Sequence, residues 1–141
     1  YQNIFFFIFK SVWPETDDKN RLCLVSELAP REYLDYLKKN GISYIAVGKK
    51  SIDLKEAVRI LETEFGSKRI GVVGGGHING SFLEAGLIDE VSMVYGAGID
   101  GRSSQPTAFE GIPESHTVPY KLTLQSVEKV ADQSVWIRYT V

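Results

Sequence analysis

Hydrophobic and polar positions along the 141-residue chain form alternating blocks of two kinds. Short apolar runs bounded by turn-forming residues are typical of strands buried in a sheet. Five such runs predict strands at 3–9, 21–26, 42–48, 68–73 and 89–98.

Between these runs, apolar residues recur at helical intervals in three segments: 29–41, 53–66 and 78–86. In the first segment, Pro30 suits an opening turn and Gly41 a terminator. In the second, Asp53 and Glu56 have the spacing of a capping box. The three segments are therefore predicted to be helices.

The last part of the chain has a different pattern. Segments 121–130 and 134–141 alternate apolar and polar residues and predict an antiparallel hairpin around 131–133. Two stretches rich in turn-forming residues, 12–20 and 99–119, are predicted to be loops.

The order of these elements predicts an α/β fold. Strands alternating with helices between residues 21 and 96 need right-handed crossovers and a largely parallel sheet covered on both faces. The closing hairpin makes that sheet mixed, which gives a three-layer α/β/α arrangement. A length of 141 residues with 43% hydrophobic content fits a single soluble domain over 1–141.

Composition narrows the functional classes. The formal charge is −2 with basic residues scattered, so the chain shows no footprint for nucleic acid or an anionic membrane. Cys23 is the only cysteine, cannot form an internal disulfide, and fits a small buried hydrophobe in a reducing cytoplasm. The apolar run at 4–9 is too short to span a membrane and is expected to be a core strand.

Three consecutive glycines, Gly74, Gly75 and Gly76, separate a predicted strand from a predicted helix. Open α/β folds bind ligands at such places, because backbone N–H groups and the positive end of the helix dipole converge there. The dinucleotide fingerprint fails because Asn79 stands where a third glycine is needed, and the phosphate loop fails because Ser81 replaces its lysine. Two interpretations remain: a tight turn, or a site for an anion or nucleotide.

Other candidate residues carry less information. His77 follows the glycines, where its imidazole could face a phosphate or lie in solvent. His116 has no Cys, Asp or second His at ligand spacing, so no metal site is expected. Asp89 and Glu90 are interpreted as a solvated turn, and no Ser–His–Asp arrangement can be argued.

The stretch VVGGGHINGSFLEAGLIDEVSMVYGAGIDG at 72–101 resembles the C-terminal reductase domain of the bifunctional riboflavin-biosynthesis deaminase/reductase. This family belongs to the dihydrofolate reductase-like superfamily. The similarity runs from about residue 21 to 141 and includes the terminal hairpin.

The resemblance implies an NADPH-dependent reductase of a pyrimidine or pterin-like substrate, similar to 5-amino-6-(5-phosphoribosylamino)uracil reductase, that forms a homodimer. It implies that the glycine turn and helix start hold the cofactor's pyrophosphate, and that two strand ends receive its adenosine-phosphate portion. These cofactor-binding residues are Gly74, Gly75, Gly76, His77, Ile78 and Asn79, together with Ser26, Gly48 and Lys49. The resemblance also implies a cis peptide bond between Gly74 and Gly75.

The sequence departs from the family pattern at three places. Val73 stands where the riboflavin reductases usually carry an acid, at a position implied to bind substrate. Gly98 replaces a common proline, and residues 1–20 have no match to the family's N-terminal substrate loop. We therefore expect that the domain lacks part of the family's N-terminal region. The alternative hypothesis is a non-catalytic nucleotide-binding or dimerisation remnant of the family.

Overall fold

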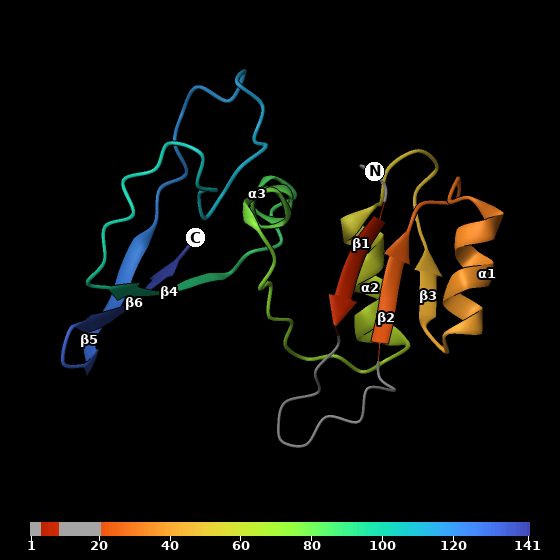
Figure 1. Cartoon of the computed structure of the whole chain (residues 1–141), viewed down its shortest axis with the longest axis horizontal. Helices are drawn as coiled ribbons and strands as arrows, with labels where there is room; N and C mark the ends of the chain where they lie inside the picture. The colour runs from red at the N-terminus through yellow and green to blue at the C-terminus, as the bar shows by residue number, and fades with distance from the viewer. Residues whose placement is uncertain (1–3, 9–20) are drawn as a thin grey trace. The chain divides into compact units, whose positions relative to one another are not determined.

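The computed structural model describes residues 4–8 and 21–141, so the predicted loop at 12–20 lies outside the described residues. The chain divides into two compact units, one ending at Ile70 and one beginning at Gly71 (Figure 1). Within the described residues, no helix is both long and apolar enough to cross a membrane.

The first unit is a three-stranded sheet with two helices. Its strands are β1 (Ile4–Ile8), β2 (Arg21–Val25) and β3 (Ser43–Ala46), with β2 in the centre. Strand β1 is antiparallel to β2, whereas β2 and β3 are parallel. The connection from β2 to β3 contains α1 (Arg31–Lys39), and α2 (Leu54–Thr63) follows β3.

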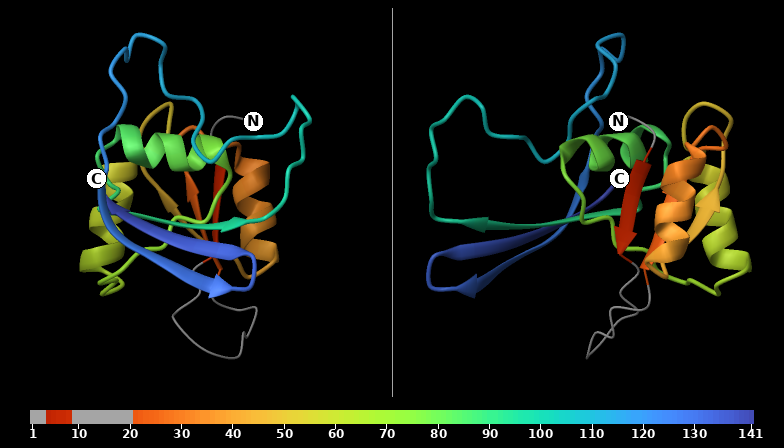
Figure 2. Two further views of the ribbon diagram at one scale, coloured as in Figure 1. Left: turned by 90° about the vertical axis from the view of Figure 1, so that its left-hand side faces the viewer. Right: turned by 45° about the vertical axis from the view of Figure 1, so that its right-hand side comes forward.

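The alternation of side chains along β2 explains why both faces of this sheet are covered. Cys23 and Val25 point to one face and pack with Leu37 of α1. Leu24 points to the other face and packs with Ala57 of α2. The two helices therefore lie on opposite faces of the sheet (Figure 2).

The predicted start of α2 is confirmed in part. The Asp53 carboxylate accepts a hydrogen bond from the backbone N–H of Glu56 at 3.0 Å, as an N-cap should. The Glu56 carboxylate instead accepts two hydrogen bonds from Arg59, at 2.7 and 2.6 Å. Half of the capping box is therefore present.

The predicted strand at 68–73 is wrong. These residues are irregular, the boundary between the two units falls within them, and Val73 is 94% exposed. An apolar run becomes a strand only when a neighbouring strand accepts its backbone hydrogen bonds. None of the strands in the described part of the chain pairs with this run.

The second unit contains α3 (Gly76–Glu84), β4 (Glu90–Gly96), β5 (Thr123–Ala131) and β6 (Ser134–Thr140). The hairpin of β5 and β6 confirms the prediction, and β4 pairs antiparallel with the other edge of β6.

The mixed α/β class is confirmed, but the predicted single sheet is not. The described strands form two three-stranded sheets, and β2–β3 is the one parallel pair among them. An apolar run indicates that a strand is buried without indicating which strand it pairs with. Strand β4 takes its partner from the end of the chain instead of extending the parallel pair.

Candidate functional site

Helix α3 begins at the glycines without a side-chain cap from the described residues. Gly75 is the N-cap residue in an extended conformation, with φ −61° and ψ 173°. Its carbonyl oxygen accepts from the amides of Ile78 and Asn79 at 2.9 and 3.1 Å. No acidic residue stands in the first turn. A helix start of this kind presents backbone N–H groups and the positive end of the dipole, which favour an anion.

The three positions are occupied by glycine for different reasons, and none of them has a positive φ. A Cβ atom on Gly74 would lie 2.6 Å from Cδ1 of Ile78, and one on Gly76 would lie 2.5 Å from the carbonyl oxygen of Thr107. A Cβ on Gly75 would meet no described atom within 4 Å. Packing therefore accounts for Gly74 and Gly76, while Gly75 leaves open the space that a ligand needs to approach the backbone.

The predicted cis peptide bond between Gly74 and Gly75 is wrong, because the peptide bonds of the described residues are all trans. The chain turns at Gly75 itself, which is extended while the next residue is already helical. This change of backbone conformation is the usual one at an N-cap.

Segment 107–111 of the long connection packs against the first turns of α3. The backbone N–H of Glu110 donates to the carbonyl oxygen of Gly76 at 2.8 Å. The side-chain amide of Asn79 donates to the carbonyl oxygen of Ala108, also at 2.8 Å. A stretch interpreted from the sequence as an irregular connection is therefore fixed to the candidate site.

One feature of the sequence indicates this contact. Gly76 and Gly80 are four residues apart and share one face of α3. A Cβ on either would collide with Glu110 or, for Gly76, also with Thr107. A helix face without side chains lets another backbone approach closely.

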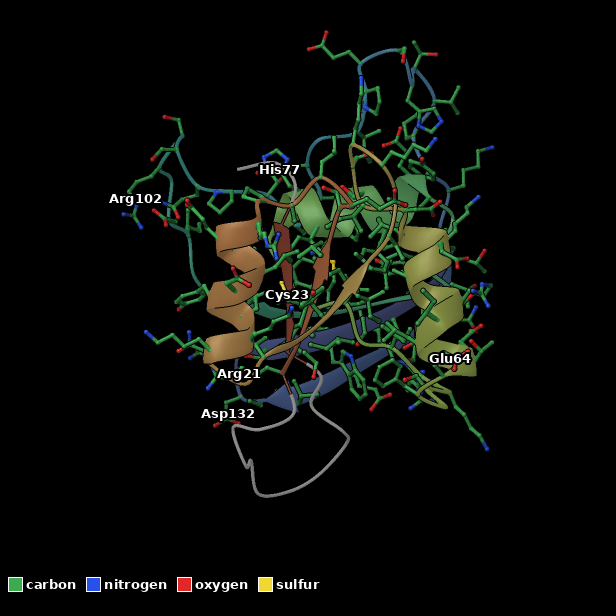
Figure 3. The ribbon with its side chains drawn as sticks, turned by 90° about the vertical axis from the view of Figure 1, so that its right-hand side faces the viewer. Arg21, Cys23, Glu64, His77, Arg102 and Asp132 are labelled. Carbon is green, nitrogen blue, oxygen red and sulfur yellow. The ribbon has the colours of Figure 1, made fainter. Side chains whose placement is uncertain are left out.

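His77 lies beside a carboxylate. Its Nε2 is 3.4 Å from Oε2 of Glu110, and the side chain is 78% exposed. The other carboxylate oxygen of Glu110 accepts from the backbone N–H of Thr107 at 2.6 Å. Figure 3 shows the imidazole at the end of α3 that carries the glycines. The imidazole is thus open to solvent and also contacts a second segment of the unit.

Asn79 and Ile78 complete the predicted helix start. The Asn79 side chain uses its Nδ2 on segment 107–111, and its buried Oδ1 has no hydrogen-bond partner among the described atoms. Ile78 is half-buried, and its side chain occupies the space beside Gly74.

The remaining predicted cofactor residues belong to the first unit. Ser26 directly follows β2, and Gly48 and Lys49 are the second and third residues after β3. Because these strands are parallel neighbours, their carboxyl ends share one edge of the sheet, where the N–H of Glu27 donates to the carbonyl oxygen of Gly48 at 2.9 Å. Ser26 is 1% exposed, and its Oγ has no partner within the described residues. Buried hydroxyls normally have one.

Gly48 is required by the backbone. Its φ is +80°, a conformation that residues with a Cβ rarely adopt. A Cβ there would also collide with the carbonyl oxygen of Ser51 and lie 2.8 Å from the backbone nitrogen of Asp53. Lys49 is exposed next to this turn.

The predicted residues thus form two groups, one in each unit. The first group is Ser26, Gly48 and Lys49, and the second is the run from 74 to 79. Val73 lies beside the second group and is exposed.

Cys23 contributes no reactive group. Burial raises the pKa of its thiol, and its Sγ lies 3.6 Å from the Tyr33 hydroxyl. A thiol with a raised pKa is a poor nucleophile. The prediction that Cys23 is a buried hydrophobe is confirmed by its exposure of 0%.

Comparison with known families gives a clear match. The model of the RibD C-terminal domain matches residues 10–136. Two curated relatives both bear the name 2,5-diamino-6-ribosylamino-4(3H)-pyrimidinone 5′-phosphate reductase. The relative from Archaeoglobus fulgidus is 27% identical over 117 residues, which are 82% of this chain and 50% of the relative. The relative from Aquifex aeolicus is 29% identical over 96 residues, which are 68% of this chain and 42% of the relative. The chain thus spans half or less of the length of these relatives.

Solved structures share the fold. A pyrimidine reductase-like protein from Corynebacterium diphtheriae superposes with a TM-score of 0.71 at 21% identity, over 85% of this chain and 49% of the other. RibD from Acinetobacter baumannii superposes with a TM-score of 0.62 at 21% identity, over 75% of this chain and 28% of the other.

Proposed function

The chain belongs to the RibD C-terminal domain family, and on this premise we propose that it acts in an NADPH-dependent reductase of a pyrimidine or pterin-like substrate. The observation that carries the proposal is the start of α3, which has no side-chain cap within the described residues and leaves open space at Gly75. Backbone amides at a helix start that has no side-chain cap suit a pyrophosphate.

We assign a different part of the cofactor to each of the two groups of residues. Gly74 to Asn79 hold the pyrophosphate, mainly through the backbone N–H groups of Gly75, Gly76 and His77, because those of Ile78 and Asn79 donate to the carbonyl oxygen of Gly75. Ser26, Gly48 and Lys49 bind the adenosine-phosphate portion. The buried and unpartnered hydroxyl of Ser26 supports this second assignment, because a ligand oxygen would satisfy it.

When bound, NADPH supplies a hydride to the heterocyclic substrate, and one proton from solution or from an acid balances the reduction. The chain's own contribution is to bind and orient. Lys49 would offer a positive charge to a phosphate, and the amides at Gly75 and Gly76 would hold the pyrophosphate at the start of α3. Val73, exposed next to the glycines, is the position proposed to face the substrate.

The names of the relatives suggest the substrate class. Both curated relatives are named as reductases of a ribosylamino-pyrimidinone phosphate. We therefore place a phosphorylated pyrimidine first among the candidate substrates and a pterin second. We also propose a dihydrofolate reductase-like, three-layer arrangement, a homodimer and a cytoplasmic location, with 1–141 as one reductase-like domain.

The test is to titrate the full-length protein with NADPH, following cofactor fluorescence, and then to follow loss of NADPH absorbance with each substrate. Binding followed by oxidation with a pyrimidine phosphate would support the proposal. Binding without oxidation by any pyrimidine or pterin would favour a non-catalytic nucleotide-binding or dimerisation remnant. Absence of NADPH binding would contradict both the reductase and a nucleotide-binding remnant.

A further inference from the structure

We propose that segment 107–111 holds His77 at the start of α3, and that Glu110 is thereby a positioning residue for anion binding at that helix start. This inference rests on the proposed function, because it takes the pyrophosphate of the cofactor to bind at α3. Glu110 itself is not proposed to touch the cofactor.

Segment 107–111 is fixed to α3 independently of His77. Its backbone is joined to the helix by the hydrogen bond from Glu110 to Gly76 and by the bond from Asn79 to Ala108. The Thr107 hydroxyl donates to the carbonyl oxygen of Phe109 at 2.8 Å, which closes the segment on itself. Because the segment is held at several points, it can serve as a fixed support for a side chain on α3.

The imidazole of His77 is supported on two sides. Its Nε2 lies 3.4 Å from the Glu110 carboxylate. On the other side, a Cβ on Gly111 would lie 2.8 Å from Nδ1, so the ring occupies space that any other residue would need. Gly111 has a φ of +78°, which also favours glycine. The ring is therefore oriented even though most of it is exposed.

The negative charge of Glu110 is expected to have two opposite effects on anion binding. A carboxylate near an anion site should by itself repel a phosphate. However, one oxygen of Glu110 accepts from Thr107 and the other faces His77. A carboxylate that contacts one ring nitrogen fixes the orientation of an imidazole. We infer that the orienting effect exceeds the repulsion.

The experiment compares Glu110→Gln with Glu114→Gln, which removes the same charge from an exposed position in the same connection. Affinities for inorganic pyrophosphate, NADPH and adenosine 2′-phosphate are measured by calorimetry on the full-length protein. We expect Glu110→Gln to weaken pyrophosphate and NADPH about fivefold, which is the net effect of about one hydrogen bond. Adenosine 2′-phosphate, assigned to the first unit, should bind unchanged. Glu114→Gln should alter none of the three affinities.

His77→Ala provides the second variant, because an exposed side chain can be removed without loss of the fold. It should produce a similar loss, and in its background Glu110→Gln should no longer weaken pyrophosphate binding, since the oriented ring is already gone and only the repulsion by the carboxylate is left to remove. Unchanged or tighter pyrophosphate binding in Glu110→Gln would overturn the inference. Pyrophosphate binding that depends on Glu110, without NADPH binding, would overturn the proposed function alone. A parent protein that binds neither ligand would overturn both.

Discussion

The backbone N–H of Glu110 donates to the carbonyl oxygen of Gly76 across 2.8 Å. This bond joins the long connection after β4 to the first turn of α3. It forms only because Gly76 and Gly80 present no side chain on the face of α3 that the connection approaches. Two glycines that look costly for a helix therefore have a packing function.

Gly80→Ala is expected to destabilise the second unit. The added Cβ would collide with the carbonyl oxygen of Glu110, a backbone atom that cannot move away cheaply. Overpacking costs roughly 1–3 kcal/mol, and a collision with a backbone atom belongs to the upper part of that range, so the cost exceeds the gain of about 1 kcal/mol from the better helix propensity of alanine. The free energy of unfolding in urea measures the difference. Gly98→Ala is the control, because its Cβ would meet no described atom within 4 Å and the position lies outside the helix. Equal stability of the two variants would contradict the packing argument.

Gly75→Val is expected to weaken NADPH binding about tenfold or more, equivalent to at least ~1.4 kcal/mol. The extended backbone of Gly75 accommodates valine, and the surrounding space is open, so the fold should persist. The isopropyl group would fill the space that the proposed pyrophosphate needs. Fluorescence titration with NADPH gives the affinity. Gly98→Val, at another position with open space, should bind like the parent. If Gly75→Val also did so, the pocket assignment would be wrong.

The sequence was most informative where a local interaction decides the structure. Asp53 was predicted to begin α2 from its type and spacing, and its carboxylate does accept the Glu56 amide. Glu56, however, pairs with Arg59, because an arginine three residues further along the helix offers two donors in good geometry. The capping-box pattern alone contains no information about this competitor.

Features that depend on distant parts of the chain could not be predicted in the same way. The apolar run at 68–73 looked like a strand, but strand formation depends on a partner that no local pattern specifies. The support of His77 by segment 107–111 was missed for the same reason. The three glycines at 74–76 indicate a candidate site, whereas the separate roles of Gly75 and Gly76 depend on contacts with segment 107–111 that no local pattern contains.

Assembly provides a third prediction. In β6, Trp136 points to one face, and Val135, Ile137 and Tyr139 point to the other. The cross-strand partners of Tyr139 and Ile137 in β5 are Leu124 and Val127, which are both more than half exposed. Cross-strand partners share a face, so these four residues extend one apolar surface that a second copy of the chain is proposed to cover.

We therefore expect a dimeric mass in solution at micromolar concentration, measured by sedimentation equilibrium. Val127→Glu places a charge on the apolar surface and should shift the protein towards monomer. Glu128→Lys changes charge on the opposite face of β5 and should leave the mass unchanged. A strictly monomeric parent protein would remove the prediction.

The contact between Cys23 and Tyr33 predicts a loss of stability at alkaline pH. Burial is the largest cause that raises the pKa of both groups; together with the hydrogen bond and the charge of Cys23 and the charge of Tyr36, it raises the pKa of Tyr33 from 10.0 to about 12. Between these two values the unfolded chain releases the Tyr33 proton while the folded chain keeps it. Stability must then fall as pH rises, because the unfolded state binds fewer protons. The same sign holds for the Cys23 thiol above its ordinary pKa of 9.0.

In urea unfolding under reducing conditions from pH 8 to 11.5, Tyr33→Phe should therefore lose less stability than the parent. Tyr95→Phe, at an exposed position in the second unit, should follow the parent. Identical pH dependence in parent and Tyr33→Phe would show that the buried hydroxyl does not govern the alkaline transition.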